Sequence, residues 1–321
     1  MVSMALPIDA PTPRSRPGGL LIDAVDTLDI AALAHPVPKI DGTSVPPDPE
    51  KWRQGIEFVP LGCSGLSRRD VDLCSDPGVA LTDEDHPVPF APNSVEFGPF
   101  GIVGMEKCAA GRLTEKWLTD RILARFGAFE SEQIAAELLG VDPVAGALSP
   151  TLKTSATVLD PGNTGTLYHA IALIEEGLAA RLHGAAGIIH VTPAAMLYLQ
   201  AGGGLIRDAW KWYTPSGHQV VFDAGFDGTV PTPFTYDGDG EVIVDGDGAP
   251  VLDEVDETDI DEWAYGSGPV ALKLDTPDPV GRGAEVIDRR KNRIEVFRVA
   301  TGLFVFEPCT VVAAGFAYPT T

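Results

Sequence analysis

The sequence is poor in positive charge. Its 321 residues include 23 Lys and Arg against 46 Asp and Glu, which gives a formal net charge of -23. Phosphate groups would repel a surface of this sign, so the composition argues against a protein that binds nucleic acid over its whole surface. Hydrophobic residues make up 44% of the chain and charged residues 21%, which is typical of a folded globular protein.

Long apolar runs and paired cysteine motifs are also absent. No run of 18 apolar residues occurs, so no transmembrane helix is predicted. The first residues lack the charged and apolar regions of a secretory signal, and the chain is therefore expected to fold in a cytoplasm. The four cysteines form no C-x-x-C pair, which argues against a zinc ribbon and favours buried free thiols. They are Cys63, Cys74, Cys108 and Cys309.

The motifs of common enzymes are missing as well. The segment Gly62-Cys63-Ser64-Gly65 is one residue short of a nucleophile elbow, and no H-E-x-x-H, P-loop or G-x-G-x-x-G motif follows a predicted strand. His190 ends a predicted strand and His218 begins one, and a structural role is favoured for each over catalysis. An α/β hydrolytic enzyme that uses His190 or His218 stays open as a less favoured function. We predict no catalytic, cofactor-binding or metal-binding residues, and hence no enzyme.

One segment is strongly acidic. Between Trp212 and Leu272 there is no Lys or Arg, and the segment contains 14 of the 46 acidic residues. Most of these acids lie between Asp237 and Glu262, where two Asp-Gly-Asp-Gly stretches flank residues 242–244. Neither stretch places Gly and Glu where an EF-hand loop requires them. A solvated acidic loop is therefore predicted in preference to a calcium site.

The N-terminal third is predicted to be largely extended. Residues 1–50 contain nine prolines, which exclude a long helix there, and such an arm would be ordered only by lying on another surface. Strand-like segments at 55–59 and 95–98 bracket a polar stretch that is rich in turn residues, which favours a long two-stranded excursion.

Helical and strand patterns dominate the rest of the chain. Apolar residues recur at helical spacing from 113 to 139, and Gly140 marks the end of this long helix. A second helix is predicted over 166–183, followed by a buried strand over 187–191 and a short helix that Thr192 and Pro193 begin. Further strands are predicted over 219–222, 269–274, 293–298 and 302–314, the last two as an antiparallel pair.

The order of these elements resembles the major capsid proteins of tailed double-stranded DNA phages. Their Hong Kong 97-like fold is shared with encapsulin shells. The helix, strand and helix over 167–193 resemble the axial domain of that family. Residues 214–221 resemble its Gly- and Pro-containing strand, with Gln219 where proline is common. Residues 265–270 resemble a Gly-rich turn and strand, and residues 289–307 resemble the closing strand pair.

The resemblance implies an α+β capsid-type fold with an N-terminal arm, an extended loop, a peripheral domain with a long spine helix, and an axial α/β domain. The implied boundaries are 1–51 for the arm, 52–112 for the extended loop, 113–165 for the peripheral domain with the spine helix, 166–285 for the axial domain with an acidic insertion at 236–262, and 286–321 for the closing strands of the peripheral domain.

The function that the resemblance implies is self-assembly. Copies of the chain would form hexamers and pentamers of an icosahedral shell that encloses phage double-stranded DNA without sequence-specific binding, assembled in the cytoplasm of a bacterial host. Portal, scaffold and decoration proteins are further expected partners, and no membrane is involved. An encapsulin-like nanocompartment for protein cargo is the alternative.

Contacts between subunits are expected at two groups of residues. The arm and the extended loop would overlie neighbouring subunits and bury Phe58, Phe97 and Phe100 between chains. The one basic cluster of the sequence would form ion pairs between subunits, each worth about 0 to 1 kcal/mol if exposed. Its arginines are Arg289, Arg290 and Arg293.

Overall fold

The computed structural model describes residues 97–109, 115–140, 150–160, 165–232, 260–275 and 293–318. It also describes short strands outside these stretches: β1 (Asp26–Thr27), β2 (Val37–Pro38), β3 (Ser44–Val45), β4 (Ile56–Phe58), β5 (Val95–Phe97), β15 (Asp278–Pro279) and β16 (Glu285–Asp288). Helices and strands are both prominent, so the predicted α+β class is confirmed. No helix in the described residues is long and apolar enough to cross a bilayer.

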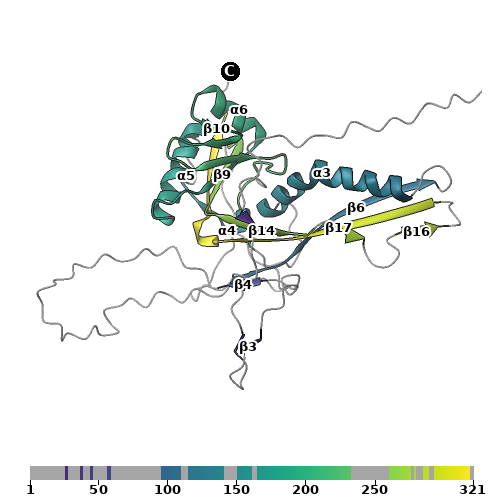
Figure 1. Ribbon diagram of the computed structural model, residues 1–321. Helices are drawn as coiled ribbons and strands as arrows, with labels where there is room; N and C mark the ends of the chain where they lie inside the picture. The colour runs from purple at the N-terminus through teal and green to yellow at the C-terminus, as the bar shows by residue number, and fades with distance from the viewer. Residues whose placement is uncertain are drawn as a thin grey trace, which may run out of the picture.

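The longest strands belong to a six-stranded sheet. β17 (Arg293–Phe306) pairs with β6 (Phe100–Ala109) along the whole of β6, and also with β14 (Val270–Leu274), β15 and β16. β1 adds to β14 as a parallel strand. The long helix α3 (Glu115–Leu139) packs against β6 and β17 and runs along them in Figure 1. We call β6, β17 and α3 the blade.

Helix α3 covers one face of the blade. Leu118, Ile122 and Phe126 of α3 form a buried cluster with Val296 and Ala300 of β17. On β6, Gly104 allows the helix to come close, because a Cβ atom there would lie 2.6 Å from the Phe126 ring. Side chains on a strand alternate between the two faces of a sheet. The residues between those that face α3 therefore point to the opposite face.

The second sheet has eight strands in the order β10-β11-β12-β9-β13-β18-β7, and β8 also pairs with β18. Its strands are β7 (Thr157–Val158), β8 (Gly165–Thr166), β9 (Ile188–Val191), β10 (Ile206–Asp208), β11 (Lys211–Tyr213), β12 (Gln219–Phe222), β13 (Glu262–Ser267) and β18 (Val312–Ala317). Helix α5 (Leu167–Arg181) packs on β13 and β18, and α6 (Pro193–Ala201) packs beside α5. We call this sheet with α5 and α6 the body; it lies at one end of the blade (Figure 1).

The central strands of the body are buried on both faces. All four residues of β9 are buried. Ile188 belongs to an apolar cluster shared with α3, whereas its neighbour Ile189 belongs to a cluster with α5 and α6. Val221 and Val220 of β12 divide between the same two clusters. The body sheet is therefore sandwiched between two layers, and the first of these joins the body to the blade.

Caps explain where the helices of the body begin. The Thr166 hydroxyl accepts a hydrogen bond from the His169 N–H at 3.4 Å, and the Thr192 hydroxyl accepts one from the Ala195 N–H at 3.1 Å. Pro193 occupies the first turn of α6, where its missing N–H costs nothing. The predicted helix, strand and helix over 166–200 are confirmed, as is the long helix that ends before Gly140.

The closing strands differ from the prediction. The expected antiparallel pair over 293–298 and 302–314 is wrong, because β17 is one continuous strand of 14 residues. After the short 3-10 helix η3 (Pro308–Thr310), β18 enters the body sheet and pairs with β13. Gly302, where the second strand of that pair was expected to begin, lies inside β17 and makes room for a close contact: a Cβ atom there would collide with the Phe100 ring. Of the closing segment 286–321, only β16 and β17 lie in the blade's sheet.

Two further expectations concern the N-terminal half and the cysteines. β4 and β5 pair antiparallel with Ile56 opposite Phe97, as the pattern of the extended segment predicted. Most of the arm and of the extended loop lies outside the described residues, as does most of the acidic insertion at 236–262. The expectation of buried free thiols is wrong for Cys309, which is disulfide-bonded.

Candidate functional site

His190, the first catalytic candidate, lies in the core of the body. Its side chain is 1% exposed, and its Nε2 atom is 2.8 Å from the hydroxyl of Ser267. That hydroxyl donates to the Gly268 carbonyl at 3.0 Å, so Nε2 is the atom that carries the proton toward Ser267. Burial lowers the pKa of His190 from 6.5 to about 3, which keeps the imidazole neutral. Ser267 is fully buried too, so no substrate reaches this serine–histidine pair.

His218 also has a structural partner. It is buried, and its Nδ1 atom accepts a hydrogen bond from the Gly187 N–H at 2.9 Å. This bond ties the start of β12 to the segment that leads into β9, where the two strands run parallel. Both histidines therefore hold the body together. The hydrolase hypothesis loses the residues on which it rested.

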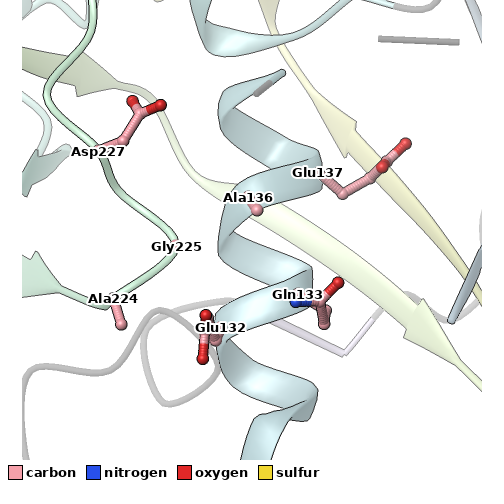
Figure 2. Close-up of a pocket in the computed structure, with 7 residues that line it drawn as sticks. All are labelled: Glu132, Gln133, Ala136, Glu137, Ala224, Gly225 and Asp227. Carbon is pink, nitrogen blue, oxygen red and sulfur yellow. The ribbon is translucent and has the colours of Figure 1, made fainter. Parts of the chain in front are cut away.

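A pocket lies between α3 and the loop that follows β12 (Figure 2). It has a volume of about 300 Å³ and is lined by Glu132, Gln133, Ala136, Glu137, Ala224, Gly225 and Asp227. Burial raises the pKa of Glu137. Within the described part of the chain, no three His, Cys, Asp or Glu side chains converge as a group that could hold a metal ion. The pocket offers carboxylates but no nucleophile beside a base.

The walls of this pocket form the junction between body and blade. Gly225 packs so closely on α3 that a Cβ atom there would collide with the Glu132 carbonyl oxygen and lie 2.6 Å from the Ala136 nitrogen. Beside it, the Ser131 hydroxyl donates to the Asp223 carboxylate at 2.6 Å. Backbone contact and a partly buried hydrogen bond therefore fix the loop on the helix. The junction is a structural element and positions the two regions relative to each other.

The first exposed apolar surface lies on the blade, on the face opposite α3. Val103 is 66% exposed and Met105 is 41% exposed, although both lie in the middle of a long strand. On β17 they stand opposite Val299 and Phe297, whose side chains are half-buried. Directly paired residues of antiparallel strands point to the same face. These four apolar residues define the open face of the blade.

The second exposed apolar surface lies on the body, around α6 and the β10–β11 hairpin. Leu197 is 67% exposed, and Tyr198, Ile206 and Trp210 are also exposed. Tyr168 of α5 joins them, since its hydroxyl donates to the Tyr198 carbonyl at 3.2 Å. Isolated exposed apolar residues are ordinary, whereas contiguous exposed apolar patches are typical of interaction surfaces. We call this group the body patch.

The residues predicted to contact other subunits have different positions. Phe97 is 2% exposed and packs edge-on against Phe306, with the two ring centroids 5.2 Å apart. Little of its ring is therefore accessible to a neighbouring subunit. Phe100 is half-buried and stacks on Phe304 at 4.9 Å. Phe58 ends β4 and Arg293 begins β17, but their side chains lie outside the described residues, and so do Arg289 and Arg290 entirely. The predicted contacts between subunits remain predictions.

Sequence reasoning missed both exposed surfaces. A signal for the body patch was present in α6, where Met196 and Leu199 are buried while Leu197 and Tyr198 are exposed. A helix that is apolar on all sides is expected to be covered on all sides. The open face of the blade gave no comparable signal, because apolar residues at alternate positions of a strand, such as Val103 and Met105, are also the pattern of a buried face.

Comparisons with solved structures find similar chains at low sequence identity. It is similar to a structure from Gordonia phage Cozz, with 13% identity and a TM-score of 0.47 over 98% of this chain and 92% of that one. It is similar to the capsid of an empty GTA particle, with 13% identity and a TM-score of 0.47 over 98% and 96%. It is also similar to the holo-SrpI encapsulin from Synechococcus elongatus, with 10% identity and a TM-score of 0.40 over 71% and 79%.

No family model and no curated protein matches the sequence.

Proposed function

We propose that this chain is a structural shell protein, a phage-type major capsid protein whose copies assemble into a closed icosahedral container for double-stranded DNA. The observation that carries the proposal is the contrast between buried polar chemistry and exposed apolar surface. His190 and His218 are buried, whereas the open face of the blade and the body patch are exposed. Surfaces of this kind on a folded protein are covered by a partner, and self-association supplies one in every copy.

The sequence resemblance supports the same reading. The long helix that the resemblance implies is present, and the implied helix, strand and second helix follow it in that order. The proposal extends to hexamers and pentamers as building blocks, to a location in the virion capsid, and to assembly in the cytoplasm of a bacterial host. Contacts by the arm and the extended loop, with Phe58, Phe100, Arg289, Arg290 and Arg293 among them, are part of it. Portal, scaffold and decoration proteins would be additional partners.

The net charge predicts how assembly responds to salt. Copies that each carry a charge of -23 repel one another, and salt screens repulsion between exposed charges beyond about 8 Å at 0.15 M. Apolar contacts do not weaken under the same conditions. We expect assembly to strengthen as ionic strength rises.

The direct test is size-exclusion chromatography with negative-stain electron microscopy of the protein expressed alone, across a range of salt concentrations. Closed particles, or hexamers and pentamers, are the expected result. A monomer at every salt concentration, with or without a coexpressed scaffold, would refute the proposal. Nuclease-resistant DNA in particles from infected cells supports a capsid, whereas copurified protein cargo would favour the encapsulin-like alternative.

A matched pair of variants separates surface chemistry from charge. Leu197→Asp places a carboxylate in the body patch, and Gln200→Asp places one on an exposed neighbouring residue of α6. Both variants change the net charge equally. We expect Leu197→Asp to abolish or strongly reduce assembly and Gln200→Asp to retain it. Equal loss in both variants would mean that charge, and not burial of the patch, limits assembly.

A further inference from the structure

The outer edge of β6 is a long strand edge with free backbone groups. Among the described strands, β6 pairs only with β17, along its full length from Phe100 to Ala109. The other edge therefore presents a row of N–H and C=O groups without a strand partner in the described residues. Natural proteins protect such edges with charges, prolines or bulges, because an open edge recruits further strands. From residue 100 to 105 the strand has no charged residue and no proline.

This edge is held in a fixed place. One face of β6 lies under α3, with Gly104 against Ile122 and Phe126. Glu106 is anchored by two helix arginines, with its Oε1 atom 2.8 Å from Arg125 Nη1 and 3.4 Å from Arg121 Nε. A strand that docks here pairs with an edge that is already ordered. Binding therefore costs the conformational entropy of the incoming strand alone.

The arm of the same sequence supplies a segment that fits the edge. β1 shows that the arm adds a strand to this sheet, since Asp26 and Thr27 pair with Ala271 and Leu272 at the β14 side. Just before β1, residues 20–25 read Leu-Leu-Ile-Asp-Ala-Val, without proline or glycine. In an added strand, alternate residues of this segment would extend the open face of the blade beside Val103 and Met105.

Charge favours the same partner. The side chains of Arg121 and Arg125 are 52% and 58% exposed, and they share the single carboxylate of Glu106. These three side chains leave a local excess of one positive charge, in a chain with a net charge of -23. Residues 20–25 carry one negative charge, at Asp23, and no positive charge. The arm of the same copy is fixed by β1 at the β14 side of the sheet, so a second copy has to supply the segment for the β6 edge.

We propose that residues 20–25 of a second copy of this chain add a strand to the outer edge of β6, beside the open face of the blade. The inference rests on the proposed shell function and names the contact that links neighbouring blades. Main-chain hydrogen bonds would supply affinity, and Val103 and Met105 would select apolar side chains on the incoming strand.

Site-specific photo-crosslinking tests this contact in assembled particles. Unlabelled copies carrying p-benzoylphenylalanine at position 103 are mixed before assembly with ¹⁵N-labelled copies that lack it, and crosslinked peptides are identified by mass spectrometry. The expected product joins position 103 to a labelled peptide that contains residues 20–25. The same photo-crosslinker at position 197, where Leu197 is equally exposed, should not capture that peptide.

Three outcomes would overturn the inference while leaving the shell function intact. They are capture of the unlabelled copy alone, capture of a different segment such as 52–94 or 289–293, and no capture at position 103 within well-formed particles. If the unsubstituted protein does not assemble, the proposed function fails, and this inference fails with it.

Hydrogen–deuterium exchange of the unsubstituted protein gives an independent readout. Amides of β6 that point to the outer edge should be slowed in particles relative to isolated subunits. A variant that lacks residues 1–25 should lose this added protection, even if it still assembles. If the β6 amides stay protected in particles of this variant, another segment or protein covers the β6 edge.

Discussion

The body and the blade bury their apolar side chains in different ways. In the body, neighbouring residues such as Ile188 and Ile189 enter separate apolar clusters, so the sheet is covered on both faces by the chain itself. In the blade, α3 covers one face, and Val103 and Met105 of the other face are exposed within the described part of the chain. The body sheet therefore has its apolar cover inside the described residues, whereas one face of the blade does not. Under the proposed function, a second copy would supply the cover for that face.

The junction between the two regions gives the largest expected effect. In Gly225→Ala, the added Cβ atom meets backbone atoms of Glu132 and Ala136, which cannot rotate away. The loop has to leave α3, and we expect the free energy of unfolding to fall by about 3 kcal/mol. Urea-induced unfolding of unassembled subunits measures this loss.

Gly127→Ala is the matched control for that prediction. It adds the same methyl group to α3 at a position where the new Cβ atom meets no atom within 4 Å beyond the adjacent residues and the backbone of its own helix. Here alanine should stabilise the helix by about 0.5 to 1 kcal/mol. If both variants unfold at the same urea concentration, the loop does not rest on the helix as described.

Whether an element could be predicted from the sequence depends on how far apart in the sequence the residues that determine it lie. The long helix and the segment 166–200 were predictable, because helical periodicity and the caps at Thr166 and Thr192 are local signals. The continuity of β17 was not predictable, because Gly302 is required by the distant Phe100 ring. A glycine that makes room for a side chain 202 positions away reads the same as a glycine that makes a turn.

The exposed surfaces escaped prediction for a related reason. Val103 and Leu197 have the sequence pattern of core residues, and only the folded chain shows that nothing in its described part covers them. Phe97 shows the reverse case, because a phenylalanine expected between subunits is buried within its own chain. Apolar pattern predicts that a residue will be covered, but it does not say by which chain.

Thr192→Val gives the next largest effect, within the body. The Thr192 hydroxyl accepts from the Ala195 N–H at the start of α6 and donates to the Glu262 carboxylate at 2.6 Å. Valine keeps the shape and removes both hydrogen bonds in a buried position, and we expect a loss of about 2 kcal/mol in unfolding free energy. Thr166→Val at the exposed cap of α5 should cost about 1 kcal/mol or less. A larger loss at Thr166 would contradict this ranking of the two caps.

Acid should weaken the body through His190. Burial lowers its pKa from 6.5 to about 3, so between these pH values the unfolded chain binds a proton that the folded chain does not. The stability from this residue is complete above pH 6.5 and is lost as pH falls toward 3, by about 1.4 kcal/mol per pH unit. Unfolding measured at pH 7.5 and pH 5.5 should therefore differ by about 1.4 kcal/mol from this residue alone.

His190→Gln supplies the comparison for the pH effect. Whatever its stability at pH 7.5, the variant lacks a group that titrates in this range, and its difference between the two pH values should be smaller by the His190 contribution. An unchanged difference would mean that His190 is not the group responsible.

The smallest change in the unfolding free energy of the subunit is expected for substitutions in the two exposed apolar surfaces. The same substitutions should change assembly the most. Trp210→Ser and Val103→Ser remove exposed apolar side chains, one from the body patch and one from the open face of the blade. Surface changes of this kind alter the unfolding free energy by about 0.5 kcal/mol or less. Both variants should therefore unfold like the unsubstituted subunit and yet assemble less well, as sedimentation velocity would show. A loss of subunit stability near 2 kcal/mol in Val103→Ser would instead mean that the blade covers this face within its own chain.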